Sequence, residues 1–135
     1  MLAVGGAGMT VGSQPTVLIV DDSEAVCLTL SMMLEKHHYQ TQAVRNSAEA
    51  LHLTSERHFD LVLVDLNLGN ESGAQLALQL LVNDPKQRIV IMSGAVNARA
   101  ELDRHPDLRS RPILYKPFSR PELLDCLRTA LNRAA

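Results

Sequence analysis

The residues that could do chemistry in this chain are polar side chains that each follow directly after a short apolar run. Asp21 and Asp22 follow the first run, and Asp65 follows a later one. Ser93 and Lys116 follow two further runs. A short apolar run that stops at polar residues is typical of a buried strand. If the strands are parallel neighbours, these side chains meet in one pocket.

Three carboxylates in one pocket need positive charge beside them. Two carboxylates about 4 Å apart repel by about 4 kcal/mol at an effective dielectric constant near 20. We therefore expect a proton or a cation to offset them, and one carboxyl pKa to rise when no metal is bound. Mg2+ prefers oxygen ligands and can also bind a phosphoryl oxygen during transfer.

The other strand-end residues fit the same chemistry. Lys116 supplies a fixed positive charge, Ser93 supplies a hydroxyl donor, and Gly94 would let backbone approach closely. With one carboxylate acting as the nucleophile, the residue types predict a site that forms an acyl phosphate.

Two kinds of segment alternate from Pro15 onward and must position these residues. Runs rich in Val, Ile and Leu predict buried strands at 17–20, 61–64, 88–92 and 113–115. A weaker run at 41–44 predicts a strand nearer an edge of the sheet.

Segments with helical spacing lie between the strands. The first helix turns Val26, Leu30, Met33 and Leu34 to one face, with Asp22 or Ser23 as a possible cap. Others are predicted at 47–57, after the pair Ser72 and Gln75, and at 97–104, where the segment is polar. The last opens with the capping box of Ser119 and Glu122.

Five alternations of strand and helix indicate an α/β fold. Continuous apolar strands joined by helices favour a doubly wound, five-stranded parallel sheet covered on both faces. We predict the flavodoxin-like strand order 2-1-3-4-5 in a three-layer α/β/α sandwich. Ligands of such sheets bind beyond the carboxyl ends of the strands, where the polar residues lie.

Composition narrows the class of protein. The 135 residues suit a single domain, and 46% of them are hydrophobic. A net charge of -2 argues against direct binding of nucleic acid or of an anionic membrane. No apolar run approaches the ~18 residues that span a bilayer. Cys27 and Cys126 are expected to be small buried hydrophobes in a reducing cytoplasm.

Four segments together resemble the receiver domain of bacterial two-component response regulators. They are VLIVDDS, FDLVLVDLNLGNESG, RIVIMSGA and RPILYKPFSRPEL. Each motif alone occurs by chance, but the set at matching strand ends is specific. The resemblance covers about residues 15–132. It implies a receiver domain at 15–133, preceded by a flexible N-terminal tail at 1–14.

The resemblance also implies roles for the acidic residues. Asp65 matches the phosphoacceptor and also a metal ligand. Asp22 matches the direct ligand of Mg2+, while Asp21 matches the acidic neighbour that reaches the ion through water. Asn67 matches the position that offers the ion its backbone carbonyl.

The remaining site residues and the partners follow from the same resemblance. Ser93 matches the hydroxyl that holds the phosphoryl group, and Lys116 matches the lysine that pairs with it, with a cis bond to Pro117. The phosphoryl donor would be a phosphohistidine on a sensor histidine kinase or a histidine phosphotransfer protein. The domain would catalyse the transfer and its own dephosphorylation without being an enzyme in the usual sense.

Two positions depart from the family pattern. Ile113 stands where the family usually has the Tyr or Phe that moves inward with the hydroxyl, so Tyr115 could contribute instead. Gly69 stands where the family usually has Pro, which predicts a looser loop after Asp65. Both changes concern the signal that leaves the site and not the phosphorylation chemistry.

Other functions compete with a phosphoaccepting receiver. A small-molecule phosphatase that works through an aspartyl phosphate would carry a second acid two residues after the nucleophile, where this chain has Asn67. A docking module could keep the fold without turning over phosphate. The chain ends after the last predicted helix, so we expect either a stand-alone regulator or a receiver fragment of a hybrid histidine kinase or larger regulator.

Overall fold

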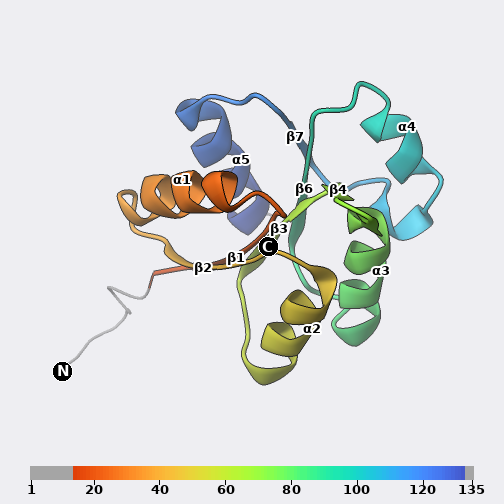
Figure 1. The fold of residues 1–135 in the computed structure, drawn as a ribbon, viewed down its shortest axis with the longest axis horizontal. Helices are drawn as coiled ribbons and strands as arrows, with labels where there is room; N and C mark the ends of the chain where they lie inside the picture. Colours follow the sequence, from red (N-terminus) through yellow and green to blue (C-terminus); the bar gives the residue numbers. More distant parts are fainter. Residues whose placement is uncertain (1–13, 133–135) are drawn as a thin grey trace.

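The computed structural model describes residues 14–132, so the predicted tail lies outside the described residues except for Gln14. A five-stranded parallel sheet forms the centre of the molecule (Figure 1). Its order is β2-β1-β3-β6-β7, which is the predicted 2-1-3-4-5 order counted over the strands of this sheet, with β2 at one edge. The strands are β1 Thr16–Val20, β2 Gln40–Val44, β3 Leu61–Asp65, β6 Ile89–Ser93 and β7 Ile113–Tyr115.

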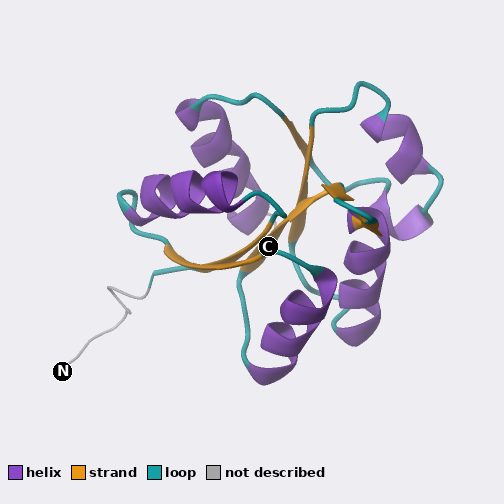
Figure 2. Cartoon of the chain, in the orientation of Figure 1, coloured by secondary structure: helices purple, strands orange, loops and turns teal. Residues whose placement is uncertain are grey.

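Helices cover both faces of the sheet and make the three predicted layers (Figure 2). Helices α1 (Glu24–Glu35) and α5 (Arg120–Asn132) pack on one face. The other face carries α2 (Ser47–Glu56), α3 (Gly73–Asn83), α4 (Ala98–Asp103) and the 3-10 helix Pro106–Leu108. Predicted and observed boundaries differ by one residue at several ends.

The central strands β1, β3 and β6 are apolar almost throughout, with the polar exceptions Thr16, Asp65 and Ser93 at their ends, as expected for strands buried on both faces. In β1, Val17 and Ile19 pack with α1 and α5, whereas Leu18 and Val20 pack with α2 and α3. All four side chains are fully buried, and each such burial stabilises the fold by about 1.5 to 3 kcal/mol. This rigid centre fixes the position of every strand end.

The helices begin where their capping residues predict. Ser23 accepts a hydrogen bond from the Val26 amide (3.2 Å), so Ser23 rather than Asp22 caps α1. Asn46 and Ser72 cap α2 and α3 in the same way. At α5 both bonds of the capping box of Ser119 and Glu122 form (2.8 and 3.2 Å). Side-chain caps of this kind each stabilise a helix by about 1 kcal/mol.

The loop after Asp65 contains a short hairpin that the sequence did not predict. β4 (Asn67–Leu68) and β5 (Glu71–Ser72) pair antiparallel as a small hairpin. Gly69 lies in its turn at φ +74°, a conformation that glycine adopts freely and proline cannot. The glycine thus allows a tight turn between the two strands, and the looser loop stays a prediction.

No helix among residues 14–132 combines the length and the apolar character that crossing a bilayer would require. Cys27 is buried against the sheet, as expected, while Cys126 is only half-buried. Both are free thiols.

Candidate functional site

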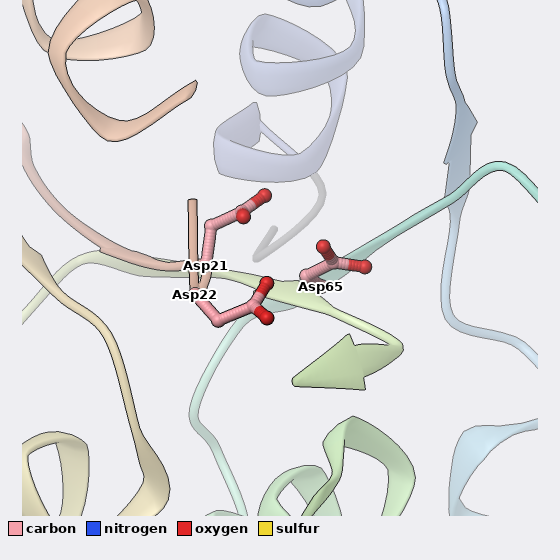
Figure 3. A group of neighbouring side chains, drawn as sticks. All are labelled: Asp21, Asp22 and Asp65. Atoms are coloured by element: carbon pink, nitrogen blue, oxygen red, sulfur yellow. The ribbon is translucent and has the colours of Figure 1, made fainter. Parts of the chain in front are cut away.

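Three carboxyl groups converge at the carboxyl ends of β1 and β3 (Figure 3). One oxygen each of Asp21, Asp22 and Asp65 lies within 4.8 Å of the others. The sheet enforces this, because Val20 and Val64 are opposite each other in the β1–β3 register and the acids follow them. Asp21 is 1% exposed and Asp65 is 7% exposed, whereas Asp22 faces solvent. The predicted convergence of the acids is confirmed.

Lys116 lies between the two buried acids. Its Nζ donates to Oδ2 of Asp21 (2.8 Å) and to Oδ2 of Asp65 (2.9 Å). The Lys116 backbone amide donates to the Ser93 carbonyl (2.7 Å), which fixes the lysine against β6. The bond from Lys116 to Pro117 is cis, as predicted. In this structure the lysine therefore serves as the counter-ion of the acids.

The second oxygen of each buried acid accepts a backbone amide. Oδ1 of Asp21 accepts from the Ser23 amide (2.9 Å), and Oδ1 of Asp65 accepts from the Asn67 amide (3.1 Å). These bonds fix the rotation of both carboxyl groups. Asn67, predicted from its place after Asp65, thus contacts the site through its backbone.

Burial raises the pKa of Asp65, and the negative charge of Asp21 raises it further. Hydrogen bonds from Lys116 and the Asn67 amide oppose this rise without cancelling it. The sequence predicted a raised carboxyl pKa from charge repulsion, and its direction is confirmed for Asp65. Burial is the larger cause, because loss of water disfavours the charged form of an acid.

The pKa of Lys116 is raised, although burial alone would lower it. Burial lowers the lysine pKa, but hydrogen bonds and charges from Asp21 and Asp65 together raise it above the ordinary 10.5. A base with a raised pKa stabilises the fold fully at pH values below its unfolded pKa. That stabilisation is lost as the pH rises through the folded pKa.

We expect Lys116→Met to lower the free energy of unfolding by about 2 kcal/mol in metal-free buffer near neutral pH, because two buried acids lose their counter-ion. An acid with a raised pKa stabilises the fold at low pH and loses this contribution as the pH rises through its folded value. The deficit of the variant should therefore shrink on acidification, as Asp65 takes up a proton. Urea unfolding at about pH 5 and about pH 8 measures this change.

Lys86→Met is the matched control. Lys86 is exposed, and its ammonium makes no bond to the described residues, so its loss should change stability by less than about 0.5 kcal/mol. Equal stability of the two variants would rule out the counter-ion role of Lys116.

A recess opens beside Asp65 between β3 and β6. Asp65, Asn67 and Ser93 line it together with the β4–β5 hairpin and α4. Ser93 is buried, and its hydroxyl accepts from the Ala95 amide (3.0 Å). The predicted hydroxyl and the predicted acceptor thus share one recess, which has room for a group bound to Asp65.

The close approach expected at one glycine occurs at another. A Cβ on Gly94 would meet nothing within 4 Å, so the prediction for Gly94 is wrong. A Cβ on Gly73 would lie 2.0 Å from the Asp65 carbonyl oxygen. The Gly73 amide also donates to the Leu66 carbonyl (2.8 Å). Gly73 therefore lets α3 begin against the end of β3. A glycine directly after the cap Ser72 is the only signal in the sequence.

One departure from the receiver pattern, Ile113, lies on β7 together with Tyr115. Ile113 is half-buried and packs against the core under α3 and α4. Tyr115 is 46% exposed and is not among the residues packed against that core. Ile113 itself therefore offers only an aliphatic contact, and Tyr115 is the aromatic residue of β7.

The donor set fits a divalent cation that prefers oxygen ligands. Three carboxylates lie close together, and two of them are buried. Asp22 has no hydrogen bond or ion pair with any residue in the range 14–132, so its oxygens are available to an ion. Calcium and magnesium ions bind such all-oxygen sets.

Comparisons with known proteins agree with the geometry. Residues 17–128 match the response regulator receiver domain family. The chain is 30% identical over 118 residues to sporulation initiation phosphotransferase F of Bacillus subtilis, covering 85% of this chain and 92% of that protein. It is 31% identical over 116 residues to regulatory protein VirG of Agrobacterium fabrum, covering 86% of this chain and 46% of that protein.

Solved structures give the same picture. A CheY-like receiver domain from Methylobacillus flagellatus is 30% identical with a TM-score of 0.75, covering 87% of this chain and 99% of that one. A receiver domain of an HD domain-containing protein from Pseudomonas fluorescens is 26% identical with a TM-score of 0.80, covering 88% and 95%.

The extent of these matches differs between relatives. The chain spans nearly all of the Bacillus phosphotransferase but half or less of the transcriptional regulators AlgB of Pseudomonas putida and ResD of Bacillus subtilis. The family match, the strand order and the acidic pocket with its lysine all agree. The chain therefore belongs to the response regulator receiver domain family of two-component signalling, as a phosphoaccepting regulatory module and not an enzyme in the usual sense.

Proposed function

We propose that this receiver accepts a phosphoryl group onto Asp65 from a phosphohistidine and then changes its docking surface. One observation carries the proposal: a buried carboxylate, held by Lys116 at 2.9 Å, opens onto a recess that Ser93 also lines. A carboxylate oxygen of Asp65 attacks phosphorus, the bond from phosphorus to the histidine nitrogen breaks, and the imidazole leaves with the electron pair.

Each site residue has a part in this transfer. Lys116 keeps positive charge beside the oxygens of Asp65, and the Ser93 hydroxyl donates to a phosphoryl oxygen. Mg2+, held by Asp22, Asp65, the backbone carbonyl of Asn67 and, through water, Asp21, would supply positive charge for the phosphoryl oxygens. Water then attacks phosphorus, the bond from phosphorus to the Asp65 oxygen breaks, and inorganic phosphate is released together with the free carboxylate of Asp65.

The metal can be tested by stability without any donor. We expect Mg2+ at about ten times its Kd to stabilise the wild type by about 1.4 kcal/mol, and Asp22→Ala to lose this shift. Without metal, Asp22→Ala should leave the melting temperature unchanged or raise it, because Asp22 neither caps α1 nor pairs with another described residue. Thermal melts with and without Mg2+ measure both effects.

Glu56→Ala is the control for this comparison, because Glu56 is an exposed acid on α2 outside the site. It should keep the full Mg2+ shift. An Mg2+ shift of wild-type size in Asp22→Ala would remove Asp22 from the ligand set, and a large loss of stability without metal would make Asp22 structural.

Intact-mass analysis tests the proposed function. The domain is incubated with Mg2+ and either acetyl phosphate or phosphoramidate as a small donor. We expect a gain of one phosphoryl group that requires Mg2+ and that neutral hydroxylamine removes, as it does from acyl phosphates. A folded domain that gains nothing from either donor would favour the docking module without phosphate turnover.

The family implies the partners. A sensor histidine kinase or a histidine phosphotransfer protein would supply the phosphohistidine in the cytoplasm, in a phosphorelay. The similarity to a sporulation phosphotransferase supports this choice. The downstream target would read the surface around β7. The same chemistry would serve whether the domain acts alone or within a longer chain such as a hybrid histidine kinase.

A further inference from the structure

The recess beside Asp65 has an acidic rim. Glu71 on β5 and Glu101 on α4 line it along with Asp65, and they come from two different elements of the fold. Neither glutamate belongs to the metal or phosphoryl site described above. None of the residues that line the recess is cationic. A donor must therefore bring its phosphoryl group past two fixed negative charges.

A hydrogen bond holds the side chain of Glu71, whereas the carboxylate of Glu101 makes none with the described residues. Oε1 of Glu71 accepts from the Ser47 amide at the start of α2 (3.0 Å), which fixes this exposed side chain. Glu101 is half-buried, and its carboxylate makes no hydrogen bond or ion pair with residues 14–132. Glu71 likewise has no ion-pair partner in that range.

Nearby cations are engaged elsewhere. Arg99, on the same helix as Glu101, donates to the Asp103 carboxylate (3.2 Å) and to the carbonyls of Leu108 and Arg111. The Lys116 amine is taken up by Asp21 and Asp65. Neither Glu71 nor Glu101 therefore has a cationic partner among the described residues, and only the Ser47 amide at the start of α2 partly offsets the charge of Glu71.

We propose that Glu71 and Glu101 are specificity-determining residues that select donors by charge. They disfavour dianionic acyl phosphates and favour a phosphoryl group on a protonated nitrogen, such as a phosphoimidazolium flanked by cationic side chains. The inference rests on the proposed phosphorylation of Asp65 and deepens it. The physical reason is that fixed charges within about 10 Å act on an incoming ion before solvent screens them.

Two small phosphoryl donors that differ in net charge but form the same product test the effect of the glutamate charges. With acetyl phosphate, which is a dianion at neutral pH, an Asp65 oxygen attacks phosphorus and acetate leaves with the electron pair. With phosphoramidate, a monoanion because its nitrogen is protonated, the bond from phosphorus to nitrogen breaks and ammonia leaves. Both donors yield the same acyl phosphate on Asp65. Because their net charges differ, removing the charges of Glu71 and Glu101 should change the two phosphorylation rates by different factors.

The test compares phosphorylation rates of the wild type and Glu71→Gln/Glu101→Gln at saturating Mg2+. Repulsion of a dianion is twice that of a monoanion, so we expect about a twofold gain with phosphoramidate and about a fourfold gain with acetyl phosphate. Raising the ionic strength to about 0.5 M should remove most of this difference. The Glu71→Gln change keeps a side-chain oxygen as acceptor for the Ser47 amide, so the fold should be retained.

The control Glu56→Gln/Asp125→Asn changes the net charge equally at exposed positions on α2 and α5, and its rates should match the wild type. Glu101→Gln alone, which breaks no bond, should raise the acetyl phosphate rate more than the phosphoramidate rate. Equal changes for both donors in the rim variants would overturn the inference while leaving Asp65 as acceptor. A wild type that neither donor phosphorylates would overturn the proposed function itself.

Discussion

Asp65→Asn is expected to abolish the mass gain that the wild type shows with Mg2+ and a small phosphoryl donor. The amide oxygen of Asn is a poor nucleophile and cannot form an acyl phosphate, so the rate should fall by at least about 100-fold. The measurement is intact mass over time with acetyl phosphate and with phosphoramidate.

The fold of this variant should survive. The Asn side-chain oxygen can still accept from the Asn67 amide, and Lys116 keeps Asp21 as a partner. Since burial raises the pKa of Asp65, its charged form does not favour folding, and we expect a change in stability within about 1 kcal/mol. Asp125→Asn, an exposed change on α5, should be phosphorylated normally. A mass gain that persists in Asp65→Asn would place the acceptor elsewhere.

Gly73→Ala is expected to cause a large loss of stability from the smallest possible change. The new Cβ would lie 2.0 Å from the Asp65 carbonyl oxygen and 2.8 Å from the Leu66 Cα, which are both backbone atoms. Backbone cannot rotate away as a side chain can, so either α3 or the end of β3 must shift. We expect a loss of about 3 kcal/mol in urea unfolding.

The same substitution should slow phosphorylation, because a displaced β3 end moves the Asp65 carboxylate away from Lys116. A misplacement of about 1 Å can slow a reaction by about 100-fold, and we expect a fall of at least about tenfold. Rates are measured on the folded fraction at a temperature below the melting transition.

Gly94→Ala is the matched control, because it adds the same methyl group at another glycine close to the site. Its Cβ would meet nothing within 4 Å, so stability should change by less than about 0.5 kcal/mol. Gly69→Ala should fall between them, at about 1 kcal/mol, because φ +74° strains alanine without a clash. Similar losses in all three variants would mean that space at Gly73 does not position the site.

Local patterns predicted most of the fold. Apolar runs located all five strands of the main sheet, and capping residues placed the starts of α2, α3 and α5. These signals are short-range, because a strand or a cap depends on a few neighbouring residues. The small β4–β5 hairpin was missed, since two-residue strands leave almost no hydrophobic pattern.

The sequence by itself determined which chemical groups stand at the strand ends and, through the parallel sheet, that the acids Asp21, Asp22 and Asp65 meet. Only the tertiary structure decided which acid is buried and which is open, and that Lys116 joins two acids across separations of 95 and 51 residues. It alone set the contact at Gly73 and the acidic rim of Glu71 and Glu101. These properties depend on distances of a few ångströms between segments remote in the chain, and residue type and spacing carry no direct record of such distances.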